Sequence, residues 1–390
     1  MVRVSGTRFA CLALATLLAV VPLASRAADP LEINVILSLT GSAAFLGKSQ
    51  SAALSVIEDQ TNKAGGVAGR PIKFVIGDDQ STPQVGVQLM NAVIAKKAPV
   101  VIGASIVAVC NAMVPLAAEG PAVYCLSPAL HPPEGSYAFS CEASTADLFV
   151  LSTTFYRAHG WRKVAIITSN DATGQDAERG IDEAFNAQSG IQIVDREHFN
   201  TTDVSVAAQM SHIKASGAQA LIAWSTGTPI ATILRGVNDA GIDIPIETTP
   251  GNLSYAQMKA YASFMPKELY FPAPPALAAD DLPNGLMKRK VMDYVGAIKA
   301  TGTRPDVGYV AAWDPALLII DAYKRLGAGA SADQIRAYIA AVRGWVGING
   351  AYDFHATPQR GLGVNNVIMV RWDVAKDTWT AASKLGGQPL

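Results

Sequence analysis

The segment AGGVAGRPIKFVIGDDQSTP, Ala64–Pro83, decides how this chain folds, because it contains two junctions between a helix and a strand. Glycines at 65, 66 and 69 precede IKFVIG (72–77), an apolar run typical of a buried strand. Thr82 and Pro83 then have the residue types of a helix N-cap and a first helical position. A phosphate-binding loop runs from a strand through glycines to a helix. Here the order is helix, glycines, strand, which predicts a helix C-terminus with positive φ rather than a nucleotide site.

Strands and helices alternate on both sides of this segment. The predicted strands are 33–38, 72–77, 99–103, 122–127, 163–168, 191–194, 220–224 and a run that starts at 268. The predicted helices are 48–64, 83–93, 112–118, 175–188, 204–216, 229–240, 285–300 and 307–326. Such repetition predicts an α/β protein of two lobes, each with a parallel sheet covered by helices on both faces. Residues 365–372 and 377–382 are expected to form an antiparallel hairpin.

The N-terminus has the composition of a secretory signal peptide. Arg3 and Arg8 precede an unbroken apolar run at 9–21, and Ser25 and Ala27 are small residues placed for cleavage. We therefore expect residues 1–27 to be removed on export and the mature protein to be periplasmic. No later stretch is long and apolar enough to predict a membrane span.

Composition and missing motifs exclude several function classes. Half of the 390 residues are hydrophobic and 16% are charged, which predicts substantial cores rather than disorder. No basic stripe indicates a nucleic-acid partner. We find no G-x-S-x-G or H-E-x-x-H motif and no cluster of metal ligands, so we expect no enzyme activity, metal or cofactor. The adjacent Asp78 and Asp79 are expected to organise a turn.

Three cysteines follow the signal peptide, and an oxidising compartment allows one disulfide among them. Cys125 ends a predicted strand and Cys141 follows the next short one, so we favour that pair over one with Cys110. Sequence alone does not fix the pairing.

At several segments the chain resembles the periplasmic solute-binding proteins of ABC transporters, in the branched-chain amino-acid group with the type I fold. The resemblance covers nearly all of the mature chain. It rests on INVILSLTGSAAFLG (33–47), NKAGGVAGRPIKFVIGDDQSTP (62–83), VVIGAS (100–105), CLSPA (125–129), WRKVAIITSNDATGQD (161–176) and GAYDF (350–354).

This resemblance implies two Rossmann-like lobes joined by three crossings, with a ligand cleft between them. The first lobe would comprise 29–144 plus 276–347, and the second 147–271 plus 350–390. The crossings would lie near Ser144, Pro272 and Gly350. Such a protein closes on a small molecule by hinge bending and delivers it to a membrane permease. The resemblance also implies a monomer.

The resemblance places the ligand at the carboxyl ends of the strands. The residues expected to contact it are Phe45, Leu46, Ser105, Ile106, Val107, Ala108, Ala129, Leu130, His131, Thr173, Trp224, Thr226, Asn252 and Phe271.

The sequence departs from the amino-acid-binding pattern of this family in three places. Ile106–Ala108 replace an expected pair of hydroxyl residues, and His131 replaces a threonine. Gly251 and Asn252 stand where an acidic partner for the ligand ammonium is expected. A buried ammonium without a carboxylate partner is costly. We therefore expect a ligand without an α-ammonium group, namely a small apolar or aromatic carboxylic acid.

Each side of such a ligand has its expected partners. Phe45, Ile106, Val107, Trp224 and Phe271 would surround a ring, while Ser105, His131 and backbone N–H groups would hold the carboxylate. Three alternatives stay open: branched-chain amino-acid binding through substituted contacts, a ligand-sensing module for a membrane partner, and an exported enzyme of unknown type.

Overall fold

The computed structural model of this protein describes residues 1–3, 6 and 29–390. The predicted signal peptide at 1–27 lies outside the described residues, apart from positions 1–3 and 6. Within the described part, no helix combines the length and apolar character that crossing a membrane requires.

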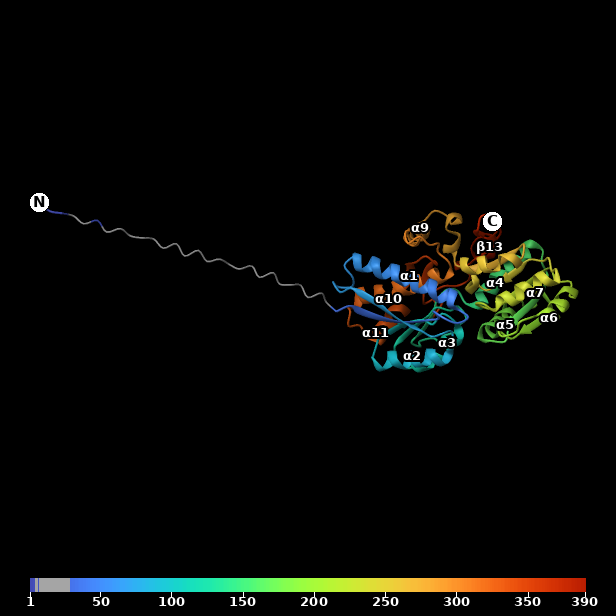
Figure 1. Cartoon of the computed structure of the whole chain (residues 1–390), viewed down its shortest axis with the longest axis horizontal. Helices are drawn as coiled ribbons and strands as arrows, with labels where there is room; N and C mark the ends of the chain where they lie inside the picture. The colour runs from blue at the N-terminus through green and yellow to red at the C-terminus, as the bar shows by residue number, and fades with distance from the viewer. Residues whose placement is uncertain (4–5, 7–28) are drawn as a thin grey trace.

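The first of two large sheets is parallel throughout, with the strand order β2-β1-β3-β4-β5. Its strands are β1 (Leu31–Leu37), β2 (Ile72–Asp78), β3 (Val100–Ile102), β4 (Ala122–Cys125) and β5 (Ala138–Ser140). The helices that pack with it are α1 (Ala44–Lys63), α2 (Pro83–Ala95), α3 (Val107–Met113), α9 (Leu286–Lys299), α10 (Val307–Leu326) and α11 (Ala332–Ala340). Helices α1 and α10 cover one face of this sheet and α2 and α3 the other (Figure 1). Their buried side chains fill the cores on the two faces. We call this unit the first lobe.

The second sheet has the order β14-β13-β10-β9-β8-β6-β7. Its strands are β6 (Lys163–Ser169), β7 (Gln192–Phe199), β8 (Ala220–Trp224), β9 (Ile246–Thr248), β10 (Leu269–Ala273), β13 (Ile368–Asp373) and β14 (Thr378–Ala381). Its helices are α4 (Thr145–His159), α5 (Ala172–Ala184), α6 (Ala207–Ala215), α7 (Ile230–Ala240) and α8 (Tyr255–Tyr261). The strands are parallel from β7 to β10, and β13 and β14 form the expected antiparallel hairpin. Side chains of α4 and α5 fill one face, those of α6, α7 and α8 the other, and this unit is the second lobe.

The chain passes between the lobes three times. It leaves the first sheet after β5 to form α4, and it leaves the second after β10 to form α9. A short antiparallel ladder of β11 (Arg343–Val346) and β12 (Ala351–Asp353) follows α11. Tyr352, Phe354 and Leu362 belong to the first-lobe core, whereas β13 begins in the second sheet at Ile368. We therefore propose that the third crossing lies between Leu362 and Ile368 rather than near Gly350; the other lobe boundaries stay predictions.

The glycine segment adopts the predicted helix-to-strand turn. Gly65, Gly66 and Gly69 have φ values of 92°, 72° and 79°, and they lie between the end of α1 and the start of β2. The Asp78 carboxylate accepts the hydroxyl of Thr40 at 2.7 Å, and Asp79 accepts the hydroxyl of Ser38 at 2.7 Å. The paired aspartates thus fix the loop after β1, and they also accept the N–H groups of Gln80 and Ser81 in the turn before α2, where they were expected to act.

The favoured disulfide pairing was wrong. The structure joins Cys110 on α3 to Cys125 on β4, and Cys141 is a buried thiol. Cys125 is in register with Ser140 on the neighbouring strand, so Cys141, one residue later, faces the opposite side of the sheet. Cys110 and Cys125 share the core under α2 and α3, whereas Cys141 lies in the core under α1 and α10.

Candidate ligand-binding site

A cavity lies between the two lobes at the carboxyl ends of their strands, and the empty space in and around it, open solvent included, is about 510 Å³. The first lobe contributes Leu46, Ser105, Ile106, Val107, Leu126, Ser127, Pro128, Ala129, Glu142, Val307 and Ala311. The second lobe contributes Thr145, Thr173, Trp224, Thr226, Thr249, Pro250 and Gly251.

The two walls of this cavity differ in chemistry. The first-lobe wall is mainly aliphatic, with Ile106, Val107 and Ala311 among its residues. The second-lobe wall presents four threonines around the indole of Trp224. Threonine hydroxyls donate and accept hydrogen bonds, so the cavity offers apolar contact on one side and polar contact on the other.

Eight of the fourteen residues predicted to contact a ligand line this cavity: Leu46, Ser105, Ile106, Val107, Ala129, Thr173, Trp224 and Thr226. Ile106 and Val107 face it because α3 begins at Val107, five residues before the predicted helix start. Whether these residues contact a ligand stays a prediction.

The other six predicted residues do not line the cavity. Phe271 is buried in the core of the second lobe and Leu130 in the core of the first. Phe45 and Ala108 lie in the first turns of α1 and α3, outside the cavity lining. The expectation that Phe271 surrounds a ligand ring is therefore wrong, because β10 turns its side chain into the sheet core. The structure likewise gives no cavity contact for Phe45.

Asn252 stabilises the second-lobe wall instead of facing a ligand. Its side-chain amide donates to the carbonyl oxygen of Ser225 at 2.8 Å and to the hydroxyl of Thr248 at 3.1 Å. Its side-chain oxygen accepts the N–H of Gly227 at 2.9 Å. The amide thus ties the loop after β8 to the loop after β9.

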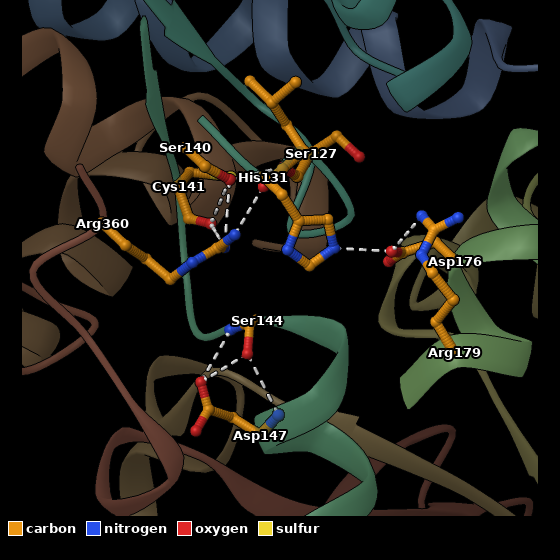
Figure 2. Close-up of polar contacts among 10 residues, drawn as sticks. Ser127, His131, Ser140, Cys141, Ser144, Asp147, Asp176, Arg179 and Arg360 are labelled. Atoms are coloured by element: carbon orange, nitrogen blue, oxygen red, sulfur yellow. Dashed lines mark hydrogen bonds and ion pairs between the residues drawn. The ribbon is translucent and has the colours of Figure 1, made fainter. Parts of the chain in front are cut away.

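His131 was expected to hold the ligand carboxylate, but its ring instead pairs with a carboxylate of the other lobe. Its Nε2 lies 2.6 Å from Oδ1 of Asp176 on α5, as Figure 2 shows. Asp176 also accepts a hydrogen bond from Arg179 at 2.9 Å on the same helix. The histidine therefore joins the two lobes beside the cavity.

The hydroxyl of Ser105 was also expected to hold the carboxylate, and it is already used inside the first lobe. It accepts the N–H of Ser38 at 3.0 Å and donates to Oε1 of Gln50 at 2.6 Å. Ser38 in turn donates to Asp79. This buried network fixes the first-lobe wall and leaves hydrogen bonding to a ligand mainly to the threonines of the second lobe.

Glu142 is a cavity residue that sequence reasoning missed. It follows β5 and is 7% exposed. Burial raises the pKa of its carboxyl group to about 7, although the nearby Arg360 guanidinium acts in the opposite direction. The cavity lining therefore includes an acidic residue, although none stands at positions 251 and 252. The sequence held one signal for this residue, because Glu142 lies two residues after β5 in SCE (140–142). Strand β5 pairs with β4, and β4 ends at the first residue of the CLSPA segment that marks the site.

Arg360 fixes the backbone beside Glu142. Arg360 is 5% exposed, and its guanidinium donates to the carbonyl oxygens of Leu130 at 2.6 Å and Glu142 at 3.2 Å. It also donates to the carbonyl oxygen of Cys141 at 3.3 Å (Figure 2). These carbonyls belong to the loops after β4 and β5, which supply much of the first-lobe wall. Arg360, which follows β12 and precedes the third crossing, thus holds two wall segments.

Further contacts hold the lobes together around the cavity. The N–H of Thr228 donates to the carbonyl of Ser42 at 3.2 Å, and that of Val307 donates to the carbonyl of Leu253 at 3.1 Å. Leu46 and Val307 of the first lobe pack in a core cluster of the second. Across the described residues, no group of histidine, cysteine and acidic side chains could hold a metal ion.

Comparison with known sequences gives two matches. A family model described as periplasmic binding protein matches residues 30–378. The leucine-, isoleucine-, valine-, threonine- and alanine-binding protein of Pseudomonas aeruginosa is 25% identical over 228 residues, which are 56% of this chain. The matched region spans 60% of the length of that relative, less than two thirds of it.

Solved structures share the fold. An ABC-transporter solute-binding protein of Rhodopseudomonas palustris in complex with benzoate has a TM-score of 0.75 at 19% identity, covering 93% of this chain and 97% of that one. A branched-chain amino-acid transporter substrate-binding protein of Streptococcus pneumoniae in complex with isoleucine has a TM-score of 0.75 at 18% identity, covering 90% and 99%. Both likenesses show the two-lobed α/β fold that the sequence predicted.

Proposed function

The chain belongs to the periplasmic binding protein family, and from that membership we propose that it captures a small apolar or aromatic carboxylate between its lobes and delivers it to an ABC-type permease. A member of this family is a binding protein and not an enzyme. Export by the N-terminal signal peptide, location in the periplasm and a monomeric state belong to the same proposal.

The observation that carries the ligand class is the composition of the cavity wall. Ile106, Val107 and Trp224 offer apolar surface that favours a ring or a branched chain. The threonines of the second-lobe wall offer hydroxyl donors for a carboxylate. The benzoate-bound neighbour of R. palustris supports this ligand class by its fold.

A branched-chain amino acid is the second candidate, because Glu142 lies in the cavity. An ionised Glu142 would pair with a ligand ammonium and remove its desolvation cost. The curated relative and the isoleucine-bound neighbour agree with this alternative. We favour the carboxylate because burial raises the pKa of Glu142 to about 7, so its carboxyl group is mostly neutral below that pH.

Calorimetry with benzoate and with leucine separates the two candidates. We expect benzoate to bind and leucine to give no heat at pH 6, and mass spectrometry of ligand released from the purified protein should show an acid without an amine. Benzoate at a hundred times its Kd should stabilise the protein by about 2.7 kcal/mol, measured as a rise in Tm. Tight binding of leucine with no response to benzoate would reject the favoured ligand.

A further inference from the structure

Glu142 is an ionisable residue in the wall of the cavity. Among the lining residues that the structure describes, no other side chain is acidic or basic. The residue as a whole is 7% exposed, and within the described chain neither side-chain oxygen of Glu142 has a hydrogen-bond partner. A carboxyl group that is largely removed from water loses free energy of hydration unless it forms a hydrogen bond. A ligand in the cavity could supply that hydrogen bond.

The backbone holds this carboxyl group in place. Glu142 has a φ of 60°, a left-handed conformation that is uncommon for residues other than glycine. The hydrogen bond from Arg360 to its carbonyl oxygen secures that conformation. The backbone at Glu142 is therefore held by a specific contact from the segment just before the third crossing.

We propose that Glu142 takes up one proton when the cavity binds a carboxylate and then donates its O–H to that carboxylate, so that Glu142 selects ligands by their charge. This inference rests on the proposed function. The proton comes from solvent, and the hydrogen bond forms between the two carboxyl groups. An amine would instead favour the ionised form of Glu142.

Glu142 takes up a proton because two carboxylates in one cavity repel each other. A ligand carboxylate beside an ionised Glu142 would place two like charges in a cavity whose described lining carries no basic side chain. One proton shared between the two groups removes that repulsion. Because burial already raises the pKa of Glu142 to about 7, adding the proton costs little near neutral pH.

Other charged or titratable groups lie near Glu142. The Arg360 guanidinium lowers the pKa of Glu142, but burial acts more strongly. The pKa of the neighbouring Cys141 thiol is raised well above its ordinary value, mainly by burial, so the thiol is neutral. Asp147 and Asp176 act on Arg360 and offset part of its positive charge.

The proposal fixes the sign and size of the pH dependence. Benzoate stays ionised between pH 6 and 8, so only Glu142 changes charge in the cavity. With a pKa of about 7 in the empty protein, affinity should fall about tenfold from pH 6 to pH 8. Binding should take up about 0.1 proton at pH 6 and about 0.9 at pH 8.

The test is calorimetry of the mature protein with benzoate at pH 6, 7 and 8, in phosphate and in Tris. The difference in heat between buffers of different ionisation enthalpy gives the number of protons taken up. Glu142→Gln should bind benzoate without proton uptake and with the same affinity at all three pH values. Glu134→Gln, an exposed site outside the cavity, is the matched control and should keep the wild-type behaviour.

The possible failures are distinct. Benzoate binding by the wild-type protein at pH 8 without proton uptake, or with release of protons, overturns the role of Glu142 and leaves the proposed function standing. No benzoate binding at pH 6 overturns the proposed function and this inference with it. Because the wild-type heats alone decide between these results, the test does not depend on Glu142→Gln folding.

Discussion

The two walls of the cavity occupy equivalent places in the two lobes and have opposite chemistry. Both come from loops at the carboxyl ends of parallel strands. The first-lobe wall is aliphatic with one carboxyl group, and it is braced by the Cys110–Cys125 disulfide and by Arg360. The second-lobe wall presents threonine hydroxyls and an indole. One architecture thus supplies apolar area from one lobe and hydrogen-bonding capacity from the other.

The largest effect should follow from filling the apolar wall. Ala311 is 3% exposed on α10 and lines the cavity. Ala311→Phe would occupy ligand space, and we expect benzoate affinity to fall roughly a hundredfold or more, about 2.7 kcal/mol. Calorimetry measures the loss, and circular dichroism checks that the variant folds.

The control for that variant is Ala208→Phe, on an exposed position of α6 far from the lining. It should bind as the wild type does. Unchanged binding by folded Ala311→Phe would show that the ligand does not enter this cavity.

Removing hydroxyls tests the polar wall. Thr173→Val and Thr226→Val keep the side-chain shape and delete a hydrogen-bond donor. Hydrogen bonds to charged groups contribute about 1.5–3 kcal/mol, so a threonine that holds the carboxylate should cost about tenfold or more in affinity. Thr202→Val, exposed and outside the cavity, is the matched control. If both cavity variants bind benzoate normally, the carboxylate is not held by these two hydroxyls.

A smaller effect is expected from the contact that joins the walls. His131→Ala removes the pairing with Asp176 across the lobes, whereas Arg179→Ala removes a partner of Asp176 on its own helix. His131 is largely exposed, and exposed pairs contribute little. We expect His131→Ala to weaken benzoate binding about two- to fivefold and Arg179→Ala to leave it unchanged. Equal effects of the two variants would remove the cross-lobe role.

The smallest effect concerns stability without ligand. Burial raises the pKa of Glu142 to about 7, so between about pH 4.3, the value for an unfolded chain, and pH 7 the folded protein holds a proton that the unfolded chain has lost. The free energy of unfolding must then fall as pH rises through this window. From pH 5 to pH 8 the Tm of the wild type should therefore fall by a few degrees more than the Tm of Glu142→Gln.

Other buried carboxyl groups also make the Tm depend on pH. Burial raises the pKa of Glu247 and Asp306 to about 7 and that of Asp314 to about 6, so the variant keeps part of the slope. Glu134→Gln should keep all of it. A Tm slope that is identical in Glu142→Gln and in the wild type would contradict the raised pKa of Glu142.

Much of this fold could be predicted from the sequence because its signals are local. The strands β6 and β8 contain the continuous apolar runs VAII (164–167) and ALIAW (220–224), and the glycines before β2 exclude a phosphate loop by their order. The disulfide was mispredicted because pairing depends on which face of the sheet each cysteine occupies. That information lies in the register of β4 and β5, not in the spacing along the chain.

The candidate site was predictable only where motifs mark it. Leu46, Ser105 and Trp224 adjoin recognisable strands, and they line the cavity. Glu142 and Thr249 follow strands of three residues, too short to show a period. Val307 and Ala311 reach the cavity from α10, more than 150 residues beyond β5, so only tertiary packing brings them there.

A crystal structure of the mature protein grown with benzoate tests the central claim most directly. We predict benzoate between the lobes, its ring against Ile106, Val107 and Trp224, and its carboxylate within hydrogen-bond distance of a second-lobe threonine and of the Glu142 carboxyl group. Benzoate outside this cavity, or a copurified ligand with an amine facing Glu142, would contradict the account.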